Sequence, residues 1–397
     1  MSATQQQQQQ QHQDTTAAEL DQFLDDPRFT QTFELPADAA RGRPEPLRVT
    51  YADYGYRDEA HPEEENVLLF FAPLVGSRML HVAKDALAKR HKIRIINPDR
   101  PGIGGTDDVI AERRMVVWRD MIPALLKHLG IRHVSLGSQS GGIVYVLDML
   151  LHHPEILHPE RPYLAVGGPW ILPAHSGVWA MTISKALPGG VIAQVDKFAS
   201  LINNVGPILS TSFGFSQTLV KLVSTKQPQQ SGAADADEDV KFEEALGPKL
   251  QNYVFSHGIH GMSQEALLLM QRAEGVSGWG DWSDYDELVP RLAEVLRAAG
   301  RRLVIDVFFA ETDDMIGNAG SKGPKWFDDS WESEQGKGVI EYTSTDVGGA
   351  DHDTIWNLKY GATQKVFAKI GSQACREGRD VQLPHDEDMA GAIAASV

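Results

Sequence analysis

Three residues able to carry out nucleophilic catalysis lie far apart in this sequence: Ser140, Asp313 and His352. A serine hydroxyl is a poor nucleophile at neutral pH and needs an imidazole to take its proton. A carboxylate beside that imidazole fixes its tautomer. These three residue types can therefore attack and release an acyl group, provided that the fold brings them to one place.

Ser140 stands in the cluster of small residues 138–142, between an apolar run ending at Leu136 and a segment with apolar residues at helical spacing. This pattern predicts a strand, a sharp turn and a helix, with the serine hydroxyl exposed at the turn. The residues two before and two after a nucleophile in such a turn must be small. Ser138 and Gly142 meet this requirement for Ser140, whereas Leu136 excludes Ser138 as the nucleophile.

His352 is the best candidate for the base because of its position. It lies in the small-residue loop 348–353, after an expected strand at 339–343 and before an expected helix at about 354–375. Loops at the carboxyl ends of parallel strands are where catalytic groups meet in open sheets. Several other histidines, such as His81, are expected on the surface or at helix ends.

Asp313 is the favoured acid because it follows the expected strand 303–309. Glu311 and Asp314 stand in the same loop, but the spacing from the strand favours Asp313. The segment after another expected strand, 163–166, contains no carboxylate. Along the chain the order is serine, acid, histidine.

Strands and helices alternate along the chain as in a doubly wound α/β sheet. The runs 67–71 and 93–96 are apolar on both faces, as strands buried inside a parallel sheet require. A strand at 47–54 is expected at or near the edge. The expected core comprises residues 40–169 and 301–376.

Three segments are expected outside this core. Residues 170–300 carry apolar helical patches and are expected to form a helical cap, with a mobile loop at 226–240. The glutamine-rich segment 1–18 is expected to be disordered, and residues 378–397 form an acidic tail.

Acyl transfer also needs hydrogen-bond donors for the oxyanion that develops on the substrate; loss of one donor typically costs about 2.7–4 kcal/mol in barrier height. The amide of Gly141, directly after the nucleophile, is one expected donor. The amide of Leu74, in the loop after strand 67–71, is the other. Pro73 lacks an N–H, but the required donor belongs to the next residue.

The chain resembles the α/β-hydrolase superfamily, and more narrowly its capped members, which include epoxide hydrolases, dehalogenases, carbon–carbon bond hydrolases and small esterases. The resemblance covers roughly residues 45–225 and 245–375 and rests on segments 69–78, 98–104 and 138–142 and on the loops of Asp313 and His352. It implies an α/β-hydrolase fold with a mostly parallel sheet of the eight-stranded type, flanked by helices. It also implies that the cap is inserted after the sixth strand.

Two departures from the family pattern bear on the chemistry. Ala72-Pro73 stands where members usually have His-Gly, so the usual supporting hydrogen bonds of that histidine are missing. Members that open epoxides or displace halide have aspartate where this chain has Ser140. A serine attacks an acyl carbonyl, which favours ester, thioester, lactone or carbon–carbon hydrolysis. Segment 98–104 is expected to form a turn.

Trp170 and Trp179, in the expected cap, are candidates for lining an apolar substrate pocket. Most aromatic and thioether residues of the cap are expected to be ordinary packing, since apolar patches at helical spacing usually mean a core.

The composition of the chain disfavours some classes of binding partner. The net charge is −17, from 37 Lys+Arg and 54 Asp+Glu, which disfavours nucleic acid and anionic membranes. Cys375 is the single cysteine, and no apolar run reaches the roughly 18 residues of a membrane span. We expect a cytoplasmic protein with a small-molecule substrate and neither metal nor cofactor; the oligomeric state is left open.

The sequence therefore predicts an esterase-like serine hydrolase that works through an acyl-enzyme, using Ser140, Asp313 and His352. Two alternatives remain open: an acyltransferase with the same three residues, and a ligand-binding protein of low turnover on the same fold.

Overall fold

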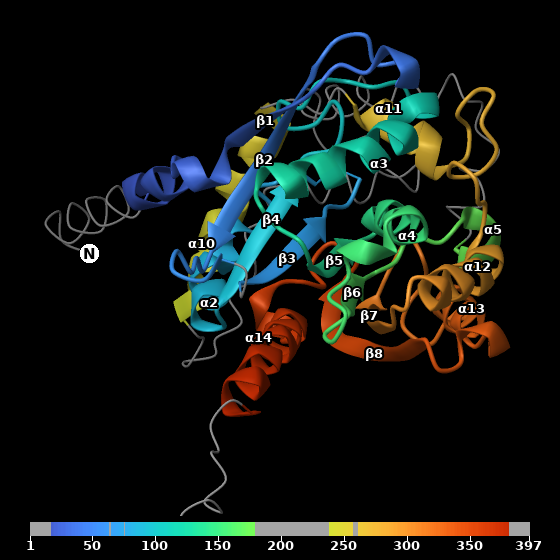
Figure 1. Ribbon diagram of the computed structural model, residues 1–397. Coiled ribbons are helices and arrows are strands. Elements are labelled where there is room, and N and C mark those ends of the chain that lie inside the picture. The colour runs from blue at the N-terminus through green and yellow to red at the C-terminus, as the bar shows by residue number, and fades with distance from the viewer. Residues whose placement is uncertain (1–16, 63–64, 75, 179–237, 257–260, 381–397) are drawn as a thin grey trace, which may run out of the picture.

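The computed structural model describes most of the expected core as one sheet covered by helices (Figure 1). The described residues are 17–62, 65–74, 76–178, 238–256 and 261–380. Eight strands form the sheet, in the order β1-β2-β4-β3-β5-β6-β7-β8. Their bounds are β1 (Gln31–Leu35), β2 (Leu47–Gly55), β3 (Asn66–Phe71), β4 (Ile93–Pro98), β5 (Ser135–Gln139), β6 (Tyr163–Gly167), β7 (Leu303–Thr312) and β8 (Ile340–Asp351).

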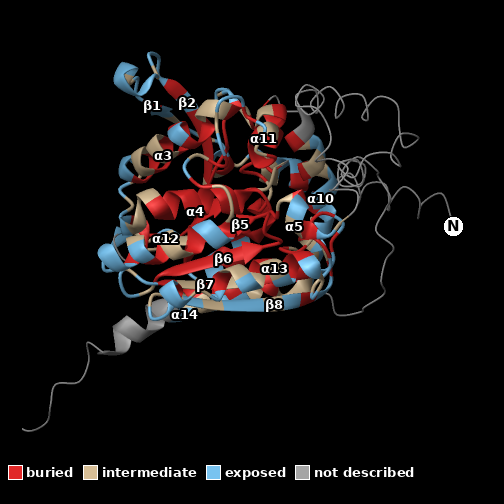
Figure 2. Cartoon of the chain, turned by 90° about the vertical axis from the view of Figure 1, so that its right-hand side faces the viewer, coloured by how far each residue is buried: buried red, intermediate tan, exposed pale blue. Residues whose placement is uncertain are grey.

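The sheet is mostly parallel, as predicted. Strand β2 pairs antiparallel with both β1 and β4, and the remaining neighbours are parallel. Every residue of β3, β4 and β6 is buried except Asn66, because helices cover both faces of these strands. Strand β8, at the edge, is largely exposed (Figure 2).

Helices lie on both faces of the sheet. On one face, the apolar core includes residues from α3 (Ala111–His128), α4 (Gly142–His152), α12 (Tyr285–Ala298) and α13 (Lys322–Trp331). On the other face, it includes residues from α2 (Asp85–Arg90), α10 (Glu238–Ser256) and α14 (Ala362–Asp380). Two further α-helices, α5 (Pro173–Ser176) and α11 (Met262–Leu269), lie in the segment between β6 and β7. Of the described helices, none combines the length and apolar character that a bilayer crossing requires.

The N-terminal part of the sheet starts earlier than residue 40. Strand β1 pairs with β2, with Phe33 opposite Val49. Its sequence has no continuous apolar run, and only one of its five residues is buried. Residues 17 and 18, expected to be disordered, belong to a helix over 17–24. Residues 1–16 lie outside the described part.

The described helices between β6 and β7 do not all form a cap that is separate from the core. Helix α12 packs on α4 and α13 and so belongs to a core layer, while α11 packs on α3. Helix α10 begins at Glu238, so residues 238–240 of the expected mobile loop are helical; residues 226–237 lie outside the described part. At the other end of the chain, α14 continues to Asp380, into the expected tail.

Candidate active site

Ser140 occupies a strained turn between β5 and α4. Its φ is 49°, in the left-handed region that residues other than glycine rarely adopt. The Ser140 N–H donates to Gly167 O at 3.0 Å, and Ser140 O accepts from the Trp170 N–H at 3.2 Å. A Cβ on Gly142 would lie 2.2 Å from Phe71 O, which explains why that position requires glycine. The turn therefore has the geometry that the small-residue pattern predicts.

The structure brings Ser140, His352 and Asp313 together at the carboxyl end of the sheet. The distance from Ser140 Oγ to His352 Nε2 is 2.9 Å. The distance from His352 Nδ1 to Asp313 Oδ2 is 2.7 Å. All three residues are buried, and Ser140 is only 4% exposed, which corrects the expectation that its hydroxyl is exposed at the turn. The three side chains thus form a continuous hydrogen-bonded relay.

Asp313 is held rigidly by its own loop. Its Oδ1 accepts from the N–H groups of Met315, at 2.8 Å, and Ile316, at 2.9 Å. These bonds leave Oδ2 for His352. The neighbouring Asp314 is exposed. The two amide hydrogen bonds to Oδ1 thus aim the other carboxylate oxygen of Asp313 at the imidazole.

The protonation of His352 follows from its partners. Burial alone would lower the pKa of His352, but the charge and hydrogen bond of Asp313 outweigh this and raise that pKa to about 9. Because Asp313 is an acceptor, the Nδ1–H of neutral His352 donates to it. Nε2 then carries the lone pair that accepts the Ser140 hydroxyl proton.

Two residues outside the predicted set tie the histidine loop to β5. The Gln139 side chain donates from Nε2 to His352 O at 3.0 Å. Trp356 donates from Nε1 to Ser138 O at 3.3 Å. Both side chains are buried. No local sequence pattern indicates either contact, because each joins segments more than 200 positions apart.

The two residues expected to bind the oxyanion lie in loops that leave adjacent strands. Strands β3 and β5 pair with Phe71 opposite Ser138. Gly141 directly precedes α4, where the first amides have no acceptor within the helix. Leu74 lies in a turn that the Gly76 N–H closes by donating to Pro73 O at 2.8 Å.

Segment 98–104 forms a turn, as expected, and also makes a contact that the sequence did not reveal. The buried Arg100 guanidinium donates from Nη1 to Ala72 O at 2.8 Å and from Nη2 to Pro73 O. Its neighbour Asp99 is bound by the buried Arg78, with 2.5 Å between Nη1 and Oδ2. Asp99 therefore holds the turn, while Arg100 reaches the loop of Leu74.

The candidate pocket residues have different outcomes. Trp170 is 2% exposed and its indole N–H donates to Leu269 O at 3.1 Å, so it packs at the base of the inserted segment. Its role in substrate binding stays a prediction. Trp179 lies outside the described residues. Leu269 itself was not predicted, but a Cβ on Gly141 would lie 2.5 Å from its Cδ1, so Leu269 contacts the turn that holds Ser140.

His81 is a second buried histidine, which corrects the expectation of a surface position. It is 6% exposed, and its ring meets Phe70 edge-on at 4.4 Å between centroids. Lys84 Nζ lies 3.1 Å from His81 Nδ1 and donates to Glu243 Oε1 at 2.7 Å. His81 and Tyr54 line an apolar cavity of about 30 Å³ between the sheet and α14, and Ser140 does not line it.

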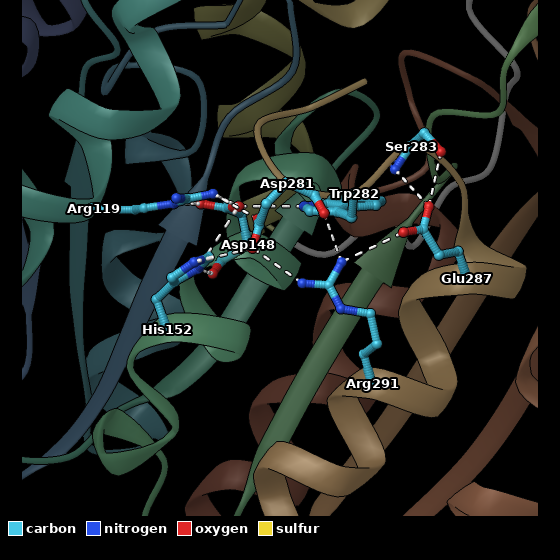
Figure 3. A network of polar contacts seen from close by, with 8 residues as sticks. All are labelled: Arg119, Asp148, His152, Asp281, Trp282, Ser283, Glu287 and Arg291. Atoms are coloured by element: carbon cyan, nitrogen blue, oxygen red, sulfur yellow. Dashed lines mark hydrogen bonds and ion pairs between the residues drawn. The ribbon is translucent and has the colours of Figure 1, made fainter. Parts of the chain in front are cut away.

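A polar cluster joins α3 and α4 to the segment before α12 (Figure 3). Asp148, His152 and Asp281 place one ligand atom each within 4.8 Å of one another. Arg119 Nε and Nη2 each donate to an Asp148 oxygen at 2.6 Å, and Arg291 pairs with Asp281 at 3.0 Å. Guanidinium groups thus already neutralise these carboxylates, which makes the cluster an ion-pair network rather than a cation site.

Comparison with known proteins identifies the architecture. No family model and no curated protein matches the sequence. An esterase from Exiguobacterium antarcticum is similar in structure, with a TM-score of 0.53, 11% identity, and coverage of 85% of this chain and 98% of that one. A thermophilic esterase from Thermogutta terrifontis has a TM-score of 0.51 and 15% identity, covering 89% and 100%. A hydrolase from Pseudomonas aeruginosa has a TM-score of 0.50 and 12% identity, covering 86% and 97%.

At these identities the likeness concerns the fold. The mostly parallel sheet, its helices on both faces and the strained turn after β5 agree with that likeness. The described chain therefore has the fold of the α/β-hydrolase superfamily.

Proposed function

We propose that this protein is a serine hydrolase that cleaves an ester, thioester or lactone of a small, fairly apolar substrate through an acyl-enzyme. The relay from Asp313 through His352 to Ser140, with contacts of 2.7 and 2.9 Å, carries the proposal. Esterases among the solved structures of similar fold support it.

In the first half of the reaction, Ser140 Oγ attacks the substrate carbonyl while His352 Nε2 takes the hydroxyl proton. Asp313 stabilises the imidazolium that results. The substrate oxygen becomes negatively charged and is bound by the amides of Leu74 and Gly141. His352 then gives the proton to the departing alcohol, thiol or hydroxyl group, and Ser140 is left as an acyl ester.

The second half repeats the same steps with water. His352 Nε2 takes a proton from a water molecule, whose oxygen attacks the acyl ester. A second oxyanion forms in the same place. When it collapses, the Ser140 oxygen leaves and recovers its proton from His352, and the carboxylic acid is released.

Labelling of the nucleophile tests this proposal. A fluorophosphonate probe should label the full chain at Ser140, and Ser140→Ala should abolish both labelling and hydrolysis of p-nitrophenyl esters. Ser138→Ala is the matched control, because Ser138 is a buried serine two residues away whose Oγ has no hydrogen-bond partner among the described residues. This variant should keep its labelling.

A series of p-nitrophenyl esters with increasing acyl length measures the depth of the substrate pocket. Adding an alcohol acceptor separates hydrolysis from transfer: an acyltransferase would release p-nitrophenol faster with the acceptor than with water alone. No labelling of the folded protein would overturn the enzyme proposal and favour a ligand-binding protein.

A further inference from the structure

Arg100 lies directly behind one of the two expected oxyanion donors. Strand β3 ends at Phe71, so the carbonyls of the next two residues, Ala72 and Pro73, have no partner within a continuing strand. One guanidinium group binds both of them, with 2.8 Å from Nη1 to Ala72 O. We call residues 72–74 the oxyanion loop. A planar guanidinium group that donates to two successive carbonyls fixes the orientation of this loop more firmly than a single donor would.

The peptide geometry turns this contact into control of the Leu74 amide. Pro73 C=O and Leu74 N–H belong to one peptide group, which is planar and trans, so the two bonds point in opposite directions. Arg100 and the Gly76 N–H both donate to Pro73 O. Holding that oxygen therefore directs the Leu74 N–H away from Arg100. A charged donor on the carbonyl also polarises the amide and strengthens its N–H as a donor.

Helix α11 of the inserted segment holds the guanidinium in place. Arg100 is 2% exposed, and its Nη1 lies 3.2 Å from Oε1 of Glu265, which is fully buried. Glu265 Oε2 accepts from Tyr145 Oη at 2.6 Å and from Arg114 Nη1 at 3.0 Å. Arg114 also pairs with Asp108 at 3.0 Å. Two buried arginines thus face the buried Glu265, and Asp108, whose side chain is 51% exposed, adds a second carboxylate at the edge of this cluster.

The same helix also contacts the other half of the expected oxyanion site. Leu269 follows Glu265 by one helical turn, so the two side chains share a face of α11. Leu269 lies against Gly141, as its contact with a Cβ placed there shows. Its carbonyl accepts from the indoles of Trp170, at 3.1 Å, and Trp279, at 3.2 Å, which anchor the end of the helix.

We propose that Arg100 is the positioning residue of the oxyanion site: it fixes the Leu74 amide through Pro73 O and is itself held by Glu265 on α11. The inference rests on the proposed hydrolase function and deepens it. It also explains how the loop is supported in a chain that has Ala72-Pro73 where His-Gly is usual. A residue acting in this way affects the transition state, in which the oxyanion exists, more than the bound ester.

Arg100→Lys tests the proposal, because it keeps the charge beside Glu265 but cannot bind two carbonyls as a fork. Lowering of kcat for p-nitrophenyl esters by roughly 10- to 100-fold is expected, with KM changed by less than about threefold. The Ki of a trifluoromethyl ketone, whose adduct with Ser140 carries an oxyanion, should rise in the same proportion. The pH dependence of kcat/KM should keep its midpoint, since the relay of His352 and Asp313 is untouched.

Arg119→Lys is the matched control. Arg119 is also an arginine paired with a buried carboxylate, that of Asp148 (Figure 3). Its side-chain hydrogen bonds go to Asp148 and Asp281 rather than to the oxyanion loop. The Arg119→Lys variant should retain kcat within about threefold of the unmodified protein, because weakening the pair of Arg119 with Asp148 affects folding rather than the transition state.

The outcomes separate this inference from the function on which it rests. An unmodified protein that is neither labelled nor active would overturn the proposed function. An active protein whose Arg100→Lys variant keeps its kcat and its trifluoromethyl ketone affinity would overturn the role of Arg100 alone. Should Arg100→Lys not fold, Glu265→Gln removes the anion that anchors Arg100, and kcat should fall roughly 3- to 10-fold. An unchanged kcat would overturn the inference.

Discussion

His352 and His81 are both buried, at 5% and 6% exposure, but they have opposite electrostatic environments. In both cases burial acts first and lowers the pKa. At His352 the Asp313 carboxylate reverses this and raises the pKa to about 9. At His81 the Lys84 ammonium adds to burial, and the pKa is held well below its ordinary value. The charge that faces Nδ1 therefore decides whether a buried imidazole accepts a second proton.

The hydrogen bonds of the two imidazole rings also differ: Nδ1 is a donor in His352 and an acceptor in His81. His352 Nδ1–H donates to Asp313, which leaves Nε2 as an acceptor for Ser140. Lys84 has only donors, so His81 Nδ1 accepts from it and the His81 proton lies on Nε2. His81 is thus held as a neutral ring whose Nε2–H has no acceptor among the described residues, whereas His352 can take up a proton and release it. Of these two buried histidines, only His352 has a carboxylate behind its ring to stabilise the protonated form.

Asp313→Asn removes the difference between the two histidines and should have the largest effect. An amide can leave the ring in the wrong tautomer and cannot stabilise the imidazolium, so kcat should fall by about 10⁴-fold, as the same change does in serine proteases. The pKa of His352 should fall with it. Steady-state kinetics and histidine NMR titration measure the two effects.

Asp314→Asn is the control, since Asp314 is the next residue and is exposed. It should stay within about threefold of full activity. Equal losses in the two variants would show that the loop as a whole, rather than the carboxylate of Asp313, supports activity.

Lys84→Met should affect stability and leave catalysis nearly unchanged. It leaves Glu243, whose side chain is 10% exposed, without its ammonium partner. Breaking a buried pair in this way should lower the free energy of unfolding by about 3–5 kcal/mol. Urea denaturation measures the loss. The double variant Lys84→Met, Glu243→Gln should recover part of it, because no buried charge is left unpaired; a kcat as low as that of Asp313→Asn would contradict the comparison.

The sequence could predict His352 and miss His81 for a physical reason. The place of His352 depends on the order of strands and on the rule that loops meet at their carboxyl ends, and both can be inferred from apolar runs. The burial of His81 depends on Lys84 and on Glu243, which is 159 positions from Lys84. Charged residues in a sequence resemble a solvated surface, and only folding shows which of them pair.

The same limit applies to Arg100 and to β1. Arg100 stands in a segment whose turn could be predicted from its glycines and proline, but Glu265 lies on a helix of the inserted segment. Strand β1 has a single buried residue, so it lacks the continuous apolar pattern that marked β3 and β4. Local patterns thus predict the central strands and the turn that holds Ser140, whereas long-range polar pairs and short edge strands need the structure.

The pH dependence of activity should follow His352 alone. Ser140 can lose its proton only to neutral His352, so kcat/KM should rise with pH to a plateau above an apparent pKa of about 9. Well below that pKa, the increase should be roughly tenfold per pH unit. His81→Asn keeps an acceptor for Lys84 and should leave the midpoint unchanged. A midpoint that moves in this variant would show that the two histidines are coupled.

The smallest expected effect is on the pH dependence of stability. The two histidines should change the free energy of unfolding in opposite directions as pH rises. Native His352 holds its proton to about pH 9 and an unfolded histidine only to about 6.5, so its contribution is complete below 6.5 and is lost as pH rises toward 9. Native His81 stays neutral where the unfolded chain takes up a proton, so its contribution is lost as pH falls below 6.5. Each slope is at most about 1.4 kcal/mol per pH unit. Urea denaturation at a series of pH values measures the free energy of unfolding. Asp313→Asn should remove its decrease above pH 6.5, and His81→Asn should remove its decrease below pH 6.5. If both decreases persist in these variants, other titrating groups cause them.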